Sequence, residues 1–176
     1  SATTAAAGSR DNTPVVLTGS ADGTVTYGND SVTVDASHTE EGYLMVSYSG
    51  SNSKVKLQIT GSDEITYTYN LHDGYETFPL TSGSGSYTVG VFENIEGTSY
   101  STLFTQAIDV TIQDEFGPYL YANQYVNFSA DSKVISKAME LSASANDDLE
   151  VIENVYNYII TNFTYDYDKA AAVQSG

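Results

Sequence analysis

The residues best suited to acid–base chemistry near neutral pH are two histidines, His38 and His72, and the chain has no cysteine. His72 is followed by Asp73, but neighbouring side chains of a strand point to opposite faces, so these two would not meet. A serine nucleophile would have to come from residues 82–86 (SGSGS), which lack the strand–turn–helix context that exposes an activated serine. We therefore interpret residues 82–86 as a flexible hairpin loop and expect no catalytic residue in this chain.

Paired carboxylates are frequent, and a glycosidase would use two of them as acid and base. Such an enzyme needs carboxylates that face each other across a cleft, whereas adjacent pairs arise from composition alone in a chain with 23 Asp and Glu residues. Asp166 and Asp168 lack the glycine and the distal glutamate of a calcium loop. We expect these side chains to be solvated, and we assign no metal-binding or cofactor-binding residue. The adjacent pairs are Glu40 with Glu41, Asp63 with Glu64, Asp114 with Glu115, and Asp147 with Asp148.

Tyrosine is unusually frequent, with 15 residues against 6 Phe and no Trp. Tyr43, Tyr48, Tyr67, Tyr69 and Tyr75 could form an aromatic face that stacks on sugar rings or peptides. Tyrosine also suits the half-buried surface of a sheet. Because Trp, the residue that most often stacks on sugars, is absent, we favour packing within and at the edges of sheets.

The charge of the chain excludes one class of partner. Six Lys and Arg residues against 23 Asp and Glu give a net charge of −17, which repels the phosphates of nucleic acids and anionic membrane surfaces. We therefore expect no nucleic-acid partner. No apolar run approaches the roughly 20 residues of a transmembrane span.

The absence of cysteine also excludes disulfides, which extracellular modules of eukaryotes often use. The sequence therefore favours the exterior of a Gram-positive bacterium, where the protein would be secreted or anchored at the cell surface. The uncharged opening at residues 1–9 resembles the spacer that follows a removed signal peptide or a lipid-anchor cysteine, or equally an end left by cloning. We expect residues 1–12 to be a flexible spacer outside the core.

Residues 13–128 show the short alternating runs of β-strands, separated by Gly, Asn, Asp and Ser. In residues 54–59, Val55, Leu57 and Ile59 alternate with polar residues, and residues 85–93 and 101–113 alternate in the same way. Seven to nine strands without intervening helices predict a mainly β fold, an Ig-like antiparallel β-sandwich. The other expected strands are residues 14–17, 24–27, 31–35, 43–48 and 64–71.

The pattern becomes helical in residues 129–176, where we expect two α-helices. The first covers residues 131–143, and the second begins at Asp147, whose position three residues before Glu150 predicts a capping box. The second helix carries an apolar stripe at helical spacing, and residues 164–168 then break the pattern. The stripe consists of Leu149, Ile152, Tyr156, Ile159, Ile160 and Phe163.

Residues 114–128 (DEFGPYLYANQYVNF) and 130–133 (ADSK) resemble secreted clostridial proteins with a transglutaminase-like domain. The resemblance continues through residues 147–149, 155–159 and 163–166, and it extends weakly back over residues 85–113. It covers about half of the chain, and its most specific parts are residues 123–127 (NQYVN) and the helix that ends in Tyr165 and Asp166.

The resemblance implies a papain-like fold whose catalytic Cys, His and Asp all follow the segment that this chain contains. No catalytic residue is therefore carried over, and acyl transfer would need the missing thiolate. Residues 13–128 would then be the non-catalytic N-terminal module of such a protein, and residues 129–176 the first helices of an incomplete transglutaminase-like domain. We expect the chain to be truncated before the catalytic Cys and not to be an enzyme by itself.

The expected function is to bind or position a cell-wall polymer or a protein substrate for a transglutaminase-like cell-surface protein. An independent Ig-like adhesion or glycan-binding domain is the alternative, and a hydrolase that uses paired carboxylates is the third class. Because the apolar stripe needs a covering surface, we expect it to pack on the sandwich or to form a dimer through Leu149, Ile152, Tyr156, Ile159 and Phe163.

Overall fold

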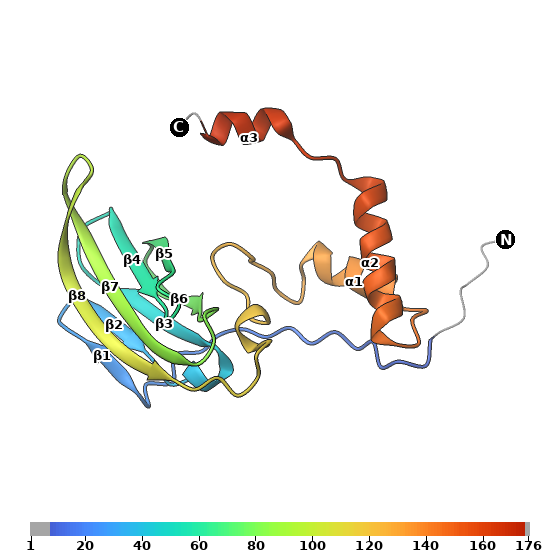
Figure 1. Cartoon of the computed structure of the whole chain (residues 1–176), viewed down its shortest axis with the longest axis horizontal. Helices are drawn as coiled ribbons and strands as arrows, with labels where there is room; N and C mark the ends of the chain where they lie inside the picture. The colour runs from blue at the N-terminus through green and yellow to red at the C-terminus, as the bar shows by residue number, and fades with distance from the viewer. Residues whose placement is uncertain (1–7, 175–176) are drawn as a thin grey trace. The chain divides into compact units, whose positions relative to one another are not determined.

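The computed structural model describes residues 8–174 of the chain, which divide into two compact units (Figure 1). One unit is Val16–Ser129, and it forms a β-sandwich. The other combines the described parts of Ser1–Val15 and Ala130–Gly176, and its secondary structure is helical. The fold is therefore mainly β with helices at its C-terminal end, as the sequence predicted.

Eight strands in the described chain form two antiparallel four-stranded sheets, in the orders β1-β2-β3-β6 and β5-β4-β7-β8. The longest strands, β7 and β8, form a hairpin that is prominent in Figure 1. The strands are β1 (Thr26–Gly28), β2 (Val32–Asp35), β3 (Tyr43–Tyr48), β4 (Val55–Thr60), β5 (Thr66–Leu71), β6 (Gly74–Pro79), β7 (Gly85–Glu96) and β8 (Ser99–Val110), and two short 3₁₀ helices are η1 (Thr39–Glu41) and η2 (Gly117–Tyr119).

The connections between the sheets follow an Ig-like path. The chain passes from β3 in one sheet to the β4–β5 hairpin in the other, returns to β6 beside β3, and crosses again to β7 beside β4. Such crossings are the Greek-key connections of an Ig-like sandwich. β1 adds one short strand beyond β2.

A tyrosine corner at the start of β7 also has an Ig-like geometry. Tyr87 is 1% exposed, and its hydroxyl donates a hydrogen bond of 2.8 Å to the carbonyl oxygen of Gly83, four residues upstream. In Ig domains a tyrosine near the start of the equivalent strand bonds back to the preceding corner in this way. Gly83 has φ 73°, a left-handed conformation that glycine adopts without strain.

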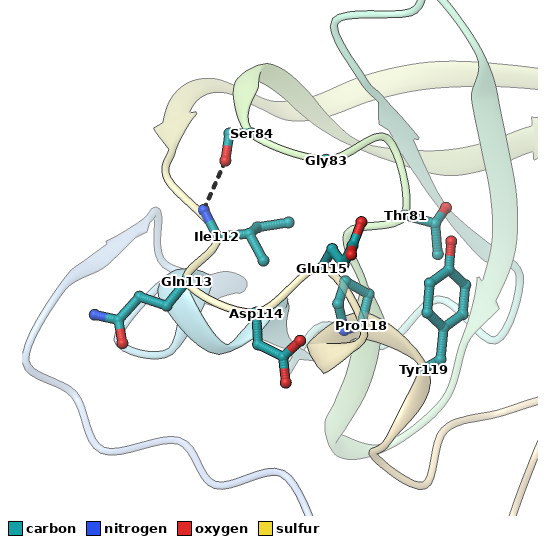
Figure 2. Close-up of a pocket in the computed structure, with 9 residues that line it drawn as sticks. All are labelled: Thr81, Gly83, Ser84, Ile112, Gln113, Asp114, Glu115, Pro118 and Tyr119. Atoms are coloured by element: carbon teal, nitrogen blue, oxygen red, sulfur yellow. Dashed lines mark hydrogen bonds between the residues drawn. The ribbon is translucent and has the colours of Figure 1, made fainter. Parts of the chain in front are cut away.

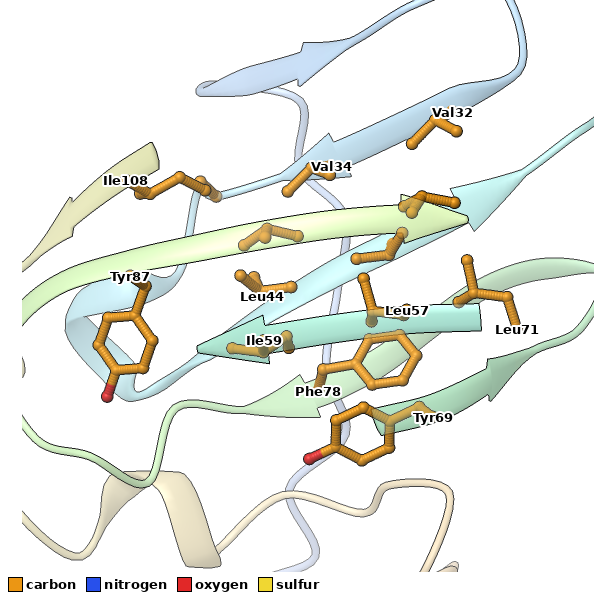
Figure 3. Packing of buried hydrophobic residues seen from close by; sticks show 14 of the residues in the cluster. Val32, Val34, Leu44, Leu57, Ile59, Tyr69, Leu71, Phe78, Tyr87 and Ile108 are labelled. Carbon is orange, nitrogen blue, oxygen red and sulfur yellow. The ribbon is translucent and has the colours of Figure 1, made fainter. Parts of the chain in front are cut away.

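The core lies between the two sheets and confirms the predicted alternation (Figure 3). Val55, Leu57 and Ile59 of β4 are all buried, whereas the residues between them are only partly buried. Close packing of this kind replaces the disulfide that many Ig-like domains use. The other large side chains of the core include Val32, Val34, Leu44, Tyr69, Leu71, Phe78, Tyr87, Val89, Val91 and Ile108.

Two strand assignments differ from the sequence-based expectation. β6 was not predicted, although Phe78 within it and Leu80 just after it are both fully buried. Its glycine and proline ends conceal the alternation, and Pro79 is tolerated because β6 is an edge strand. Residues 14–17 were expected to form a strand, but only Leu17 makes a bridge, with Tyr121.

The described part of the helical unit contains three helices, one more than the sequence predicted. They are α1 (Lys133–Ser142), α2 (Asp148–Asn162) and α3 (Tyr167–Gln174). The predicted cap of α2 is confirmed, because the carboxylate of Asp147 accepts a hydrogen bond of 2.9 Å from the backbone N–H of Glu150. None of the helices in residues 8–174 is long and apolar enough to cross a membrane.

The described end of the expected spacer lies against the helices of its own unit. The Gly8 N–H donates to the carbonyl oxygen of Ala143 at 3.0 Å, and the Asn12 side chain donates to that of Ser142 at 2.7 Å. Arg10 forms an ion pair of 2.7 Å with Asp148 in the first turn of α2. Residues 1–7 of the expected spacer lie outside the described residues.

Candidate functional site

His72 does not pair with Asp73. Its Nδ1 lies 3.1 Å from Oε1 of Glu76, and its backbone N–H donates to the other carboxylate oxygen at 2.8 Å. Gln124 donates to Glu76 at 3.0 Å and to the backbone carbonyl oxygen of Asn70 at 2.7 Å. Through Gln124 this network covers part of the free edge of β5, and proteins commonly protect edge strands in this way. The contacts of His72 are therefore explained by a structural role.

Residues 82–86 also make hydrogen bonds that stabilise the sandwich. Their loop accepts the hydrogen bond of the tyrosine corner, and Oγ of Ser84 accepts a hydrogen bond of 2.9 Å from the backbone N–H of Ile112. In the described chain no hydrogen bond joins this loop to His38 or His72. Neither histidine is therefore placed to activate a serine of this loop.

The carboxylates singled out in the sequence do not form a metal centre. Within residues 8–174 no group of three or more His, Asp or Glu side chains is arranged to hold a metal ion. Oδ1 of Asp166 instead accepts a hydrogen bond of 2.9 Å from the backbone N–H of Lys169, at the start of α3. Asp166 thus acts as a helix cap.

The five tyrosines considered for a sugar-binding face are dispersed. Tyr43, Tyr48 and Tyr69 are buried, and burial raises the pKa of Tyr69 to about 12. Tyr67 and Tyr75 are exposed, but they lie on β5 and β6, in different sheets. Three of the tyrosines therefore pack within the sandwich, and Tyr67 and Tyr75 lie on the edge strands β5 and β6, in line with the expectation of packing within and at the edges of sheets.

The structure reveals a histidine cluster that the sequence did not predict. His38 Nε2 lies 2.9 Å from Oδ2 of Asp22 and 3.2 Å from Oγ of Ser20, while Nδ1 lies 3.1 Å from Oε1 of Glu41. The imidazole stacks on the ring of Tyr43 with a centroid distance of 5.3 Å. Ser20, His38 and Glu41 thus have the residue types and the order of contacts of a Ser–His–acid triad.

The partners of His38 argue against catalysis. A triad needs a free lone pair on the nitrogen that faces the serine, but Nε2 of His38 also lies 2.9 Å from Oδ2 of Asp22. A proton on Nε2 shared with that carboxylate would leave no lone pair for Ser20. Burial of the ring disfavours the imidazolium, yet hydrogen bonds to Glu41 and Asp22 outweigh that effect and raise the pKa of His38. The cluster, which we call the clasp, therefore links two chain segments, residues 20–22 and 38–43, with the carboxylates of Asp22 and Glu41 on either side of His38.

Tyr121 extends the clasp to the segment that follows the sandwich strands. Its hydroxyl donates a hydrogen bond of 2.7 Å to Oε2 of Glu41, and its ring lies 4.4 Å from that of Tyr43. This hydrogen bond, followed by that with His38, lowers the pKa of Glu41. Burial and the hydrogen bond to Glu41 raise the pKa of Tyr121, so the phenol stays protonated.

The candidate binding site is a cavity of about 620 Å³ at one end of the sandwich, which we call the end pocket (Figure 2). It lies between the loop before β7, the segment after β8 and η2. In the segment between β8 and η2, the carboxylate of Asp114 accepts a hydrogen bond of 2.9 Å from the backbone N–H of Phe116. The side chain of Tyr119, in η2, is 65% exposed. The lining residues are Thr81, Gly83, Ser84, Ile112, Gln113, Asp114, Glu115, Pro118 and Tyr119.

The lining of the end pocket is polar and carries groups that suit binding. It offers two carboxylates and several hydroxyls, but no His, Lys or Arg side chain. Carboxylates and hydroxyls beside an exposed aromatic ring suit a polyol or a cationic group.

Comparison with known proteins gives no relative for this chain. No family model, no curated protein and no solved structure matches it.

Proposed function

We propose that this chain is the non-catalytic binding and positioning module of a transglutaminase-like protein that is secreted or anchored at the surface of a Gram-positive bacterium. One observation carries the proposal. The sandwich buries its core by itself, whereas the helical unit leaves the apolar stripe of α2 in contact with solvent. This contrast fits a complete module joined to the first helices of another domain.

The exposure of the stripe supports this division of the chain. Leu149 is 75% exposed, Ile152 is 63% exposed and Phe163 is 63% exposed. Apolar surface of this kind is unfavourable in water, so an amphipathic helix normally lies against a partner. In the parent protein that we propose, the remainder of the transglutaminase-like domain covers the stripe.

The end pocket supports the binding role. Four of its lining residues, Asp114, Glu115, Pro118 and Tyr119, fall in the segment that most closely resembles the transglutaminase-like proteins. Its chemistry suits a sugar polymer or a protein side chain. The proposed task is to hold a wall polymer or a protein substrate near the catalytic domain.

The first test is the intact mass of the protein purified from its native source, with peptide mapping beyond Gly176. A longer polypeptide that contains a cysteine in a following helix supports the proposal. A native protein without such a segment contradicts the transglutaminase-like origin, and the sandwich would then be an independent module.

In the isolated chain we propose that two copies cover each other's stripes through Leu149, Ile152, Tyr156, Ile159 and Phe163. Light scattering after size exclusion should then give the mass of a dimer. Ile152→Ser should shift the protein to a monomer, and Asn157→Ser, an exposed polar change on the same helix, should not. A wild-type monomer at all concentrations contradicts the dimer.

A second candidate is an independent Ig-like adhesion or glycan-binding domain. The observation that favours it is the exposed ring of Tyr119 beside Asp114 and Glu115, because aromatic rings and carboxylates together bind sugars. Saturable binding of a wall oligosaccharide that Tyr119→Ala abolishes, in a protein without a cysteine domain, would favour this candidate over the first.

A further inference from the structure

The positive charge of the sandwich is gathered in one place. Of the six Lys and Arg residues in the chain, only Lys54 and Lys56 lie in the sandwich, which carries fourteen of the 23 Asp and Glu residues. Both lysines line a single cavity of about 420 Å³, together with His72, Asn70 and Tyr100. We call this cavity the lysine pocket, and it shares no residue with the end pocket.

The strand register explains how the pocket forms. Lys54 and Lys56 are two residues apart along the chain, at β4 and the residue just before it, so both side chains point to the outer face of the sheet. Lys56 lies directly opposite Asn70 of β5, and residues paired across antiparallel strands share a face. The pocket is thus built on the solvent side of the β5-β4-β7-β8 sheet, near the turn between β7 and β8.

Neither lysine is neutralised within the protein. Among residues 8–174 no ion pair involves Lys54 or Lys56, although carboxylates are abundant. Within residues 8–174, Nζ of Lys56 lies over the ring of Tyr100, 5.2 Å from its centroid. A cation–π contact holds the ammonium in place but leaves its charge uncompensated.

Two carboxylates near the pocket, Glu93 and Glu76, are engaged elsewhere. Glu93 is paired with Val55 across the sheet, so it shares the inner face with Val55 and accepts a hydrogen bond from the hydroxyl of Tyr48. Glu76 is bound by His72 and Gln124. Two lysines on one face of a strand repel each other, and an anion between them would relieve that repulsion.

We propose that the lysine pocket binds an oxyanion that carries two negative charges, either a phosphate group or a dicarboxylate. Such a ligand matches the two ammonium groups in charge, and the Asn70 amide offers a neutral donor beside them. The proposal is independent of the transglutaminase-like origin and of the end pocket, so each stands or fails separately.

The test is an NMR titration of the ¹⁵N-labelled full chain with inorganic phosphate and, in a second arm, with succinate. Sodium chloride at equal ionic strength controls for screening. Saturable shifts confined to the amides of Lys54, Asn70 and Gly97 with either anion support the site, and the effective arm identifies the ligand as phosphate or dicarboxylate. The absence of saturable shifts in both arms overturns the proposal.

Variants then test the residues. Lys54→Gln with Lys56→Gln should weaken binding about tenfold, since exposed charge pairs each contribute modestly. Lys54→Arg with Lys56→Arg should retain binding, because arginine keeps the charge and adds donors. Lys133→Gln with Lys169→Gln is the matched control, since it makes the same charge change in the helical unit. Equal weakening by both Gln pairs would contradict the pocket and indicate a general charge effect.

Discussion

The sandwich and the helical unit both have regular apolar periodicity, but they bury their apolar residues to very different extents. In the sandwich, residues such as Val34, Leu57 and Phe78 are fully buried between the two sheets. In the described part of the helical unit only Ser142 and Ala145 are buried, and the apolar stripe of α2 is exposed.

The difference shows what an apolar pattern predicts and what it leaves open. Alternation along β4 specifies a buried face, and the opposing sheet of the same unit supplies the partner. The stripe of α2 specifies a buried face in the same way, but it stays exposed within the described part of its own unit. α1 contacts α2, and Asn154 of α2 donates a hydrogen bond to the carbonyl oxygen of Leu141. A pattern therefore predicts the need for a partner and does not identify it.

The largest expected effect contrasts the two units directly. Phe78→Ala should lower the free energy of unfolding by about 3–5 kcal/mol, because it removes a fully buried ring that packs edge-on against Tyr69. Ile152→Ala, at a side chain that is 63% exposed, should change it by no more than about 0.5 kcal/mol.

Urea unfolding followed by tyrosine fluorescence measures both values, at protein concentrations low enough to favour the monomer. Circular dichroism of each variant in the absence of urea controls for its fold. Similar losses for the two variants would mean that the stripe is buried in solution, and the contrast between the units would fail.

A smaller effect tests the Ig-like corner of the sandwich. Tyr87→Phe should lower the free energy of unfolding by about 1 kcal/mol, since it removes the hydroxyl that bonds to the Gly83 carbonyl oxygen and leaves the ring in place. Tyr119→Phe is the control, because this hydroxyl belongs to an exposed ring in the end pocket. If both variants are equally stable, the corner contributes nothing to stability.

Local patterns made much of the fold predictable from sequence. The alternation of Val55, Leu57 and Ile59 gave β4 because a sheet with one wet face imposes a period of two. Asp147 and Glu150 gave the start of α2 because a cap depends only on neighbouring residues. α3 was missed because the Asp166 and Asp168 positions suggested a break, whereas Asp166 caps the helix.

The candidate sites were not predictable, because residues distant in sequence form them. The end pocket needs the loop before β7 to meet the segment after β8, and this depends on the order of strands in the sheet. The lysine pocket depends on the register between Lys56 and Asn70. The clasp around His38 likewise brings Asp22 and Tyr121 together from opposite ends of the sandwich sequence.

The smallest expected effect is a dependence of sandwich stability on pH through His38. Its folded-state pKa is raised above the unfolded value of roughly 6.5, so its contribution is fully present below that value and is lost as pH rises through the folded pKa. The difference in unfolding free energy between the wild type and His38→Gln should therefore shrink from pH 6 to pH 8. Glu41 has a lowered pKa, so its contribution changes only at acid pH and stays constant in this window. Asp22→Asn should reduce the same pH dependence, because it removes one of the two carboxylates that favour the imidazolium. If neither variant changes the pH dependence of the unfolding free energy, the carboxylates of Asp22 and Glu41 do not stabilise the charged form of His38.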